Sequence, residues 1–96
     1  MDIMRYLVEF IGTFIFLSVI LITGQAIPIG LILAGMVYWG GAISGGAFNP
    51  AVSLALLIKK SINVHQFIGY IIVQFLAAIG AYHFFRYTKA FTKISS

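Results

Sequence analysis

Long apolar segments alternate with short polar ones along this chain of 96 residues. Three apolar segments, at about residues 5–23, 28–42 and 65–87, predict membrane-spanning helices, since about 20 apolar residues cross the hydrocarbon core of a bilayer. The second segment is short for a complete crossing, and at Ile43 it leads into a loop that contains glycine. The pattern therefore predicts an all-α, multi-pass integral membrane protein whose chain turns back into the bilayer after the second span.

The segment from Ile43 to Val52 carries the most unusual pattern. Asn49 followed by Pro50 predicts the start of a helix, because Asn is a favourable N-cap and Pro fits the first helical turn. The helix that follows, at about residues 50–58, ends at two lysines. At about 1.5 Å per residue it is about 13 Å long, less than half of a hydrocarbon core of about 30 Å. We expect a re-entrant half-helix, whose loop must be buried in protein or line a wet cavity.

Composition agrees with this prediction and excludes several classes of function. Hydrophobic residues make up 61% of the chain and charged residues 8%, which is typical of a membrane protein. Cysteine is absent, so neither disulfides nor thiolate metal sites are expected. The basic residues are dispersed, so the net charge of +4 does not indicate nucleic acid as a partner. Apart from Glu9, the apolar segments hold no acid, base or nucleophile constellation, so no enzyme, cofactor or metal site is expected.

Four segments stand in a distinctive order along the chain: Glu9–Phe14 (EFIGTF), Ile43–Gly46 (ISGG), Phe48–Val52 (FNPAV) and Tyr70–Gln74 (YIIVQ). In order and spacing they resemble the aquaporin and glycerol-facilitator (major intrinsic protein) family over nearly the whole chain. Members of that family usually carry two three-span repeats, inverted relative to each other in the membrane. The chain starts with Met and ends in a polar tail, so we expect residues 1–96 to be one complete domain that corresponds to a single repeat, half of an aquaporin-like fold.

A pore of this family's kind needs two half-helices that enter from opposite membrane faces. The resemblance therefore implies that antiparallel dimerisation of two identical chains completes the fold. The basic residues divide equally between the two sides of the predicted bundle: Arg5, Lys59 and Lys60 on one side, and Arg86, Lys89 and Lys93 on the other. The positive-inside rule then gives no preferred orientation, and we expect dual topology. The family's tetramers imply four pores, made of eight chains. The alternative is a fixed orientation with a different partner chain.

The resemblance places the centre of the pore at the Asn-Pro-Ala motif, Asn49, Pro50 and Ala51. The backbone of Asn49 would cap the half-helix while its side-chain amide donates to a passing oxygen. Two half-helix N-termini at the pore centre would oppose cations and protons. The carbonyl groups of the preceding loop would line the vestibule, at Ser44, Gly45, Ala47 and Phe48.

Two polar residues inside the spans are expected to support this loop. Glu9 is the only acidic residue within a predicted span, and an intramembrane carboxyl group is a candidate for function. In the family, the matching Glu braces the re-entrant loop, and we expect the same of Glu9. Gln74 is expected to hydrogen-bond between helices.

The predicted selectivity region consists of Ile29, Gly46 and Val52. The family's second repeat usually has Arg after the Asn-Pro-Ala motif, where this chain has Val52, and Ile29 falls where water channels often place an aromatic residue. Without that Arg the constriction is expected to be wider and more apolar, which favours glycerol and similar small neutral solutes as well as water.

The sequence therefore predicts a passive channel for water and small neutral solutes in a lipid bilayer. Two alternatives remain open. A small dual-topology, proton-coupled transporter would also have paired antiparallel chains and a Glu in the first span. A non-conducting half that docks on a different membrane protein would show no permeability by itself.

Overall fold

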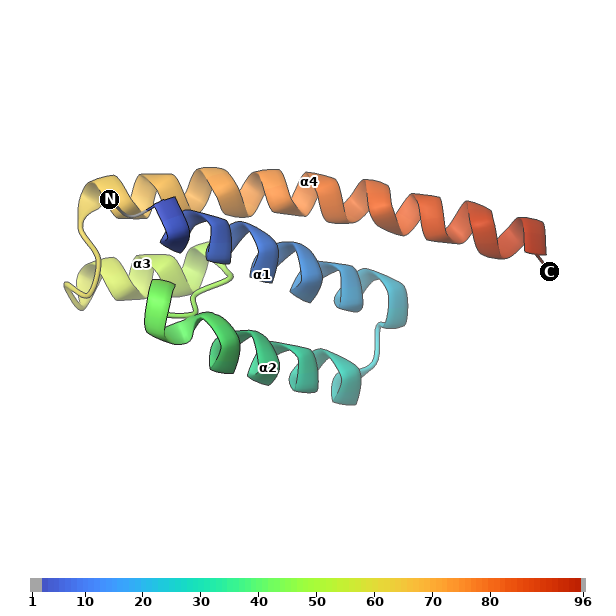
Figure 1. Cartoon of the computed structure of the whole chain (residues 1–96), viewed down its shortest axis with the longest axis horizontal. Helices are drawn as coiled ribbons and strands as arrows, with labels where there is room; N and C mark the ends of the chain where they lie inside the picture. The colour runs from blue at the N-terminus through green and yellow to red at the C-terminus, as the bar shows by residue number, and fades with distance from the viewer. Residues whose placement is uncertain (1–2, 96) are drawn as a thin grey trace.

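The computed structural model describes residues 3–95, and side chains as far as residue 92. Four helices follow one another in the chain: α1 (Ile3–Thr23), α2 (Ala26–Ser44), α3 (Pro50–Ile58) and α4 (Val64–Ser95). α1 lies between α2 and α4 and packs against both, whereas α3 packs on α4 (Figure 1). Three of these helices are long and apolar enough to cross a membrane. The described part of the chain therefore confirms an all-α arrangement of three candidate spans and one short helix.

α2 is longer than the apolar pattern predicts, because it begins at Ala26 rather than 28 and ends at Ser44 rather than 42. Pro28 lies inside the first turn of the helix. Backbone N–H groups in the first turn have no acceptor within the helix, so proline, which lacks this group, is tolerated there. Gly45 ends the helix with a φ of +91°, and its N–H donates to the Gly41 carbonyl oxygen at 2.8 Å. The second span therefore has 19 residues, enough for about 28 Å.

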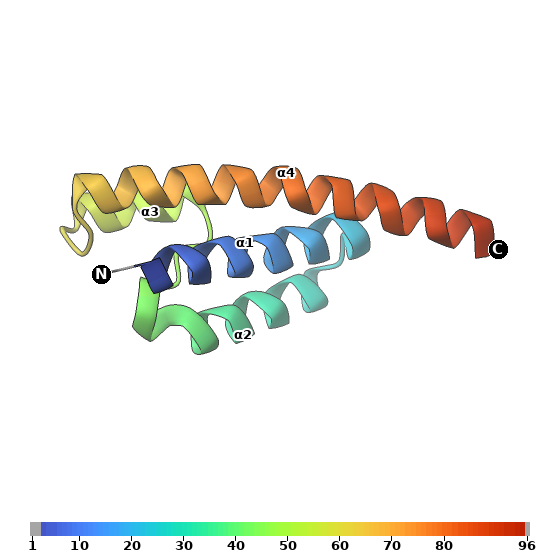
Figure 2. The ribbon, with the colours of Figure 1, turned by 45° about the horizontal axis from the view of Figure 1, so that its top comes forward.

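α4 also exceeds its predicted range of 65–87, since it continues to Ser95 over 32 residues. No Gly or Pro follows Gly80 to end it, and residues such as Lys89 and Ala90 favour helix. Figure 2 shows that its C-terminal part extends well past the turn between α1 and α2. Lys93, one of the three basic residues expected on that side of the bundle, lies within α4, but its side chain falls outside the described part.

Glycines set the close contacts between the helices. A Cβ on Gly69 would lie 2.3 Å from Cε1 of Tyr6, so α1 and α4 approach at this position. Next to it, the rings of Tyr6 and Tyr70 meet edge to face with centroids 5.9 Å apart. Gly30 and Gly35 of α2, by contrast, have nothing within 4 Å of an added Cβ. These two glycines do not contribute to packing within the single chain.

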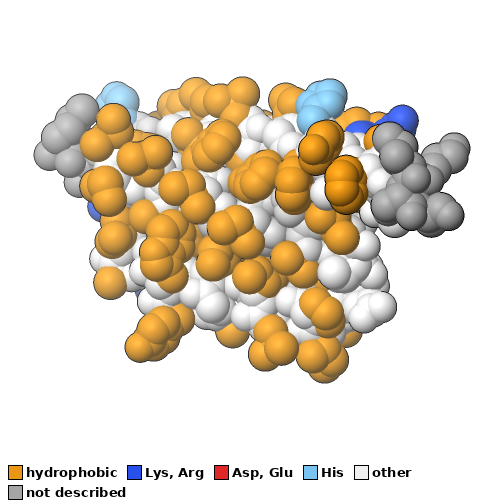
Figure 3. All heavy atoms as spheres, turned by 45° about the vertical axis from the view of Figure 1, so that its right-hand side comes forward, with side chains coloured by type: hydrophobic (Ala, Val, Ile, Leu, Met, Phe, Trp, Pro, Cys, Tyr) orange, Lys and Arg blue, Asp and Glu red, His pale blue; other side chains and the backbone are white. Residues whose placement is uncertain are grey.

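Hydrophobic side chains cover much of the outer surface, as Figure 3 shows for one face. Ile27, Leu31 and Tyr38 on α2 are 73%, 69% and 94% exposed. Large apolar surfaces of this kind are stable in hydrocarbon, where exposure carries no hydrophobic cost. The surface agrees with an integral, multi-pass membrane protein.

Candidate functional site

The carboxyl group of Glu9 is the centre of a fully buried polar network. Oε2 accepts hydrogen bonds from the Ser44 hydroxyl at 2.6 Å and the Ala47 N–H at 3.1 Å. Oε1 accepts from the Phe48 N–H at 2.8 Å and from Nε2 of Gln74 at 2.9 Å. The four donors come from α2, from the loop between α2 and α3 (residues 45–49, called the loop below) and from α4, while Glu9 itself lies on α1.

These four bonds explain how a carboxyl group can be buried here. A buried polar group without partners is costly, and more so in a membrane, where no water replaces them. Two oxygens offer about four acceptor positions, and four donors fill them. Glu9 therefore joins α1 to the loop and to α4 with no acceptor position left over.

Gln74 extends the network to the half-helix. Its Nε2 also donates to the Ser53 hydroxyl oxygen at 2.8 Å, and the Ser53 hydroxyl donates to the Asn49 carbonyl oxygen at 3.0 Å. A continuous set of hydrogen bonds thus runs from Glu9 on α1 to the first turn of α3.

Phe48 fixes the loop by its ring as well as by its N–H group. The ring is 1% exposed and fills a notch at two glycines: a Cβ on Gly12 would lie 2.1 Å from its Cε1, and a Cβ on Gly40 would lie 3.4 Å from its Cζ. Phe48 has a φ of +53°, which is uncommon for a residue with a side chain. Its bond to Glu9 and the notch hold this conformation.

Asn49 caps α3 with its side chain, not only with its backbone as the sequence suggests. Its Oδ1 accepts from the Ala51 N–H at 2.6 Å, with Pro50 in the first turn. Among the described residues, the side-chain NH₂ group of Asn49 donates no hydrogen bond to another protein group. The amide therefore keeps its donors for other partners.

A cavity of about 310 Å³ lies at the N-terminus of α3. Its walls come from α1, the loop, the first residue of α3 and α4: Thr13, Phe16, Leu17, Ile20, Phe48, Asn49, Pro50, Gln74, Phe75 and Ala78. Two of these residues, Thr13 and Gln74, have a buried side-chain oxygen with no hydrogen-bond partner in the described part of the chain. The half-helix thus points its N-terminus into an apolar space with a few unpaired polar atoms.

The predicted selectivity residues do not meet within one chain. Ile29 lies near the start of α2, and Gly46 follows the end of that helix. The helix between them rises more than about 20 Å at about 1.5 Å per residue. Val52, near the start of α3, is 41% exposed. In Figure 1 the start of α2 lies beside the end of α1, far from the loop that joins α2 to α3.

The loop residues are more buried than a vestibule lining requires. The side chains of Ala47 and Phe48 are 3% and 1% exposed, and their N–H groups point to Glu9. Ser44 belongs to α2, and its carbonyl oxygen accepts from the Tyr70 hydroxyl. Contrary to expectation, the Ser44 carbonyl therefore points into the protein. Within this loop, Gly45 and Gly46 combine a positive φ with an accessible position, whereas Phe48 has a positive φ and is buried.

Sequence reasoning missed Ser53 and Tyr70. Both are fully buried, at 0% exposure. Ser53 links Gln74 to α3, and Tyr70 links the end of α2 to Arg5, whose NH1 lies 3.4 Å from the tyrosine hydroxyl. The signal in the sequence that could have marked Ser53 and Tyr70 is that each is an isolated polar residue inside an apolar segment.

Comparison with known proteins assigns the chain to a family. The family described as Major intrinsic protein matches residues 19–94, which is most of the chain. The chain belongs to the major intrinsic protein family. Glu9 and Thr13 precede the matched residues, and the hydrogen bonds of Glu9 and the cavity wall at Thr13 place them in the site.

Two relatives in this family are named as a glycerol uptake facilitator and as an aquaporin. The chain is 44% identical over 86 residues to "Glycerol uptake facilitator protein-like 6" of Lactiplantibacillus plantarum, with 80% of this chain and 40% of the relative covered. It is 45% identical over 58 residues to "Aquaporin Z" of Brucella melitensis, with 60% of this chain and 25% of the relative covered. The chain therefore spans less than half the length of these curated relatives. No solved structure matches it.

Proposed function

We propose that this chain is half of a passive transmembrane channel for water and small neutral solutes such as glycerol. Two inverted copies of the chain form the pore. The names of the family relatives, a glycerol uptake facilitator and an aquaporin, support this class of transport. The partial coverage of those relatives leaves room for a second copy to supply what one chain lacks.

The cavity at the N-terminus of α3 is the observation that carries the proposal. α3 has nine residues, so it reaches only about 13 Å into the membrane. Beyond Asn49, the walls of α1 and α4 continue around a space of about 310 Å³. A half-helix from an inverted copy fits this position, because it enters from the opposite face and ends at the same depth. The two Asn-Pro-Ala motifs then meet near the midplane.

Pairing also explains the separated selectivity residues. In an inverted pair, the start of α2 of one chain lies at the same membrane face as the end of α2 and the base of α3 of the other. Ile29 of one chain then approaches Gly46 and Val52 of its partner. Each mouth of the pore has an isoleucine, a valine and a glycine backbone and no cation, which suits small neutral solutes that are partly apolar.

The pore centre selects against charge. The N-termini of two half-helices place partial positive charges there, which oppose the entry of cations and protons. The amide groups of the two Asn49 side chains donate hydrogen bonds to a passing oxygen. No acid or base is needed for this passage.

The bonding of Glu9 favours a bracing role over proton coupling. All its acceptor positions are occupied by groups of the loop, α2 and α4. If Glu9 took part in proton coupling, it would have to give up the hydrogen bonds that hold the loop in place before Asn49. A passive channel uses the same contacts without any such change.

Osmotic light scattering on liposomes with only this purified chain tests the proposal. We expect fast shrinkage in sucrose and re-swelling in glycerol, with no dependence on a proton gradient. The Val52→Trp variant narrows both mouths and should abolish the flux, whereas Ile72→Trp, on an exposed position of α4, should not. Folded, incorporated protein with traces equal to those of empty liposomes would contradict a self-paired channel and favour a non-conducting half.

A further inference from the structure

The C-terminal part of α4 reaches beyond the membrane core. From Val64 to Phe85 the helix rises about 33 Å, close to a hydrocarbon thickness of about 30 Å. The residues from Arg86 to Thr92 therefore lie at the depth of the lipid headgroups. Figures 1 and 2 show this extension without a neighbouring helix beside its end.

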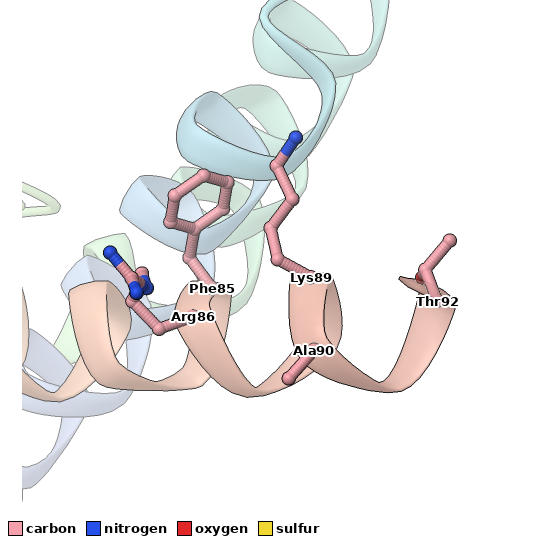
Figure 4. A pocket seen from close by; sticks show the side chains of 5 residues that line it. All are labelled: Phe85, Arg86, Lys89, Ala90 and Thr92. Carbon is pink, nitrogen blue, oxygen red and sulfur yellow. The ribbon is translucent and has the colours of Figure 1, made fainter. Parts of the chain in front are cut away.

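An open hollow of about 730 Å³ lies along this extension, lined by Phe85, Arg86, Lys89, Ala90 and Thr92. In Figure 4 the side chains of Phe85 and Lys89 point to the same side of α4, and Ala90 points to the opposite side. The Lys89 ammonium lies 5.7 Å from the centroid of the Phe85 ring, within the range of a cation–π contact. The hollow thus combines two cations with an aromatic wall.

The two cations have no anionic partner from the described part of this chain. Arg86 NH1 donates to the neutral Tyr82 hydroxyl at 3.4 Å. The sequence holds only two acidic residues. Of these, Glu9 is buried and bonded to the loop, and Asp2 precedes α1, outside the described residues. The hollow therefore presents positive charge for an anion from elsewhere.

We propose that this hollow binds the phosphate of an anionic phospholipid. The Arg86 guanidinium and the Lys89 ammonium donate to the phosphate oxygens, where charge-assisted bonds are strongest. The Phe85 ring lies on the membrane side of the two cations and contacts the glycerol and the first acyl carbons. Basic residues near an anionic leaflet attract such lipids.

Aromatic residues on the other sides of the extension favour a lipid over a soluble anion. Tyr87 and Phe91 are 66% and 63% exposed. Aromatic side chains are enriched at the boundary between hydrocarbon and headgroups. They keep the extension in the interface, where phospholipid phosphates are the most concentrated anions.

Native mass spectrometry of the detergent-purified chain tests the proposal, with phosphatidylglycerol and phosphatidylcholine as probes. We expect the wild-type chain to retain phosphatidylglycerol in preference. The Arg86→Gln/Lys89→Gln variant should bind it about 25-fold more weakly, at about fivefold for each basic residue near an anionic surface. The matched control Lys59→Gln/Lys60→Gln removes the same charge from the link between α3 and α4 and should bind as the wild type does.

Three outcomes would overturn the proposal: equal retention of both lipids, an equal loss in both double variants, and displacement of phosphatidylglycerol by inorganic phosphate at the same concentration. The last outcome would indicate a site for free anions. If the Arg86→Gln/Lys89→Gln variant does not fold, the wild-type chain still tests the proposal. Its preference for phosphatidylglycerol over phosphatidylcholine must fall as the NaCl concentration rises. The assay needs no flux, so its result is independent of the pore.

Discussion

Nε2 of Gln74 on α4 lies 2.9 Å from Oε1 of Glu9 on α1, and the same nitrogen lies 2.8 Å from the Ser53 hydroxyl on α3. One amide therefore ties both a spanning helix and the half-helix to α4. The loop that leads into the Asn-Pro-Ala motif is held between these bonds and the notch around Phe48. The geometry at the start of α3, where we propose the centre of the pore, depends on this buried network rather than on residues that would touch the solute.

Glu9→Gln tests the bracing role. A Gln side chain keeps one acceptor oxygen but turns an NH₂ group toward two donors, and leaving buried donors unpaired costs about 1–3 kcal/mol each. We expect less folded protein and a lower melting temperature in detergent, with near-normal permeability per assembled channel. A well-folded Glu9→Gln protein that loses flux would instead support a transport role for this residue.

The notch around Phe48 predicts a non-additive pair of substitutions. Gly12→Ala places a methyl group into the Phe48 ring and should destabilise the fold by about 1–3 kcal/mol, as overpacking does. Phe48→Ala should cost about 3–5 kcal/mol. In the Phe48→Ala background, Gly12→Ala should be nearly neutral or stabilising.

Urea unfolding in detergent measures this cycle. Gly35→Ala is the matched control, since an added Cβ there meets nothing within the chain. Strictly additive effects of Gly12→Ala and Phe48→Ala would show that the ring and the glycine do not interact in the folded protein.

Solute selectivity should change when a mutation places a cationic side chain at the proposed mouth of the pore. Val52→Arg adds a bulky donor near the position that we propose for Ile29 of the partner copy. We expect glycerol flux to fall more than water flux, because the opening becomes narrower and more polar. Liposome swelling in the two osmolytes measures the ratio, and an unchanged ratio in a folded variant would place Val52 outside the pore.

Orientation in the membrane should respond to the lysines between α3 and α4. The wild-type chain has an even balance of basic residues, so reporters fused to its C-terminus should be active on both sides of the membrane. Lys59→Gln/Lys60→Gln leaves the other side more basic, and the C-terminus should then lie in the cytoplasm. Ser61→Ala in the same link is the control. One-sided activity of the wild-type fusion would contradict dual topology.

Local signals predicted α3 well, whereas contacts distant in sequence were out of reach. Asn49 and Pro50 specify a helix start through their own geometry, so α3 begins at Pro50 as expected. Glu9 and Gln74 are 65 positions apart, and the family resemblance, not their spacing, marked them as supports. Ser53 joins their network only once α3 and α4 pack.

Helix ends without strong stop signals were placed less well. α4 runs on to Ser95 because no Gly or Pro interrupts its basic end, although polar residues there suggested a tail. The conformation of Phe48, with a φ of +53°, had no signal in the sequence. It depends on a notch made by glycines of two other helices.

The central claim is that two inverted copies meet around one pore, and engineered thiols test it most directly. The chain has no cysteine of its own, so a chain with Ile29→Cys and a chain with Val52→Cys can be co-reconstituted and treated with a short bifunctional thiol reagent. We predict a cross-linked dimer of the two different chains, and none when Ile72→Cys replaces Ile29→Cys. Active liposomes without the Ile29–Val52 cross-link, or with equal cross-linking of the control, would contradict the antiparallel pore.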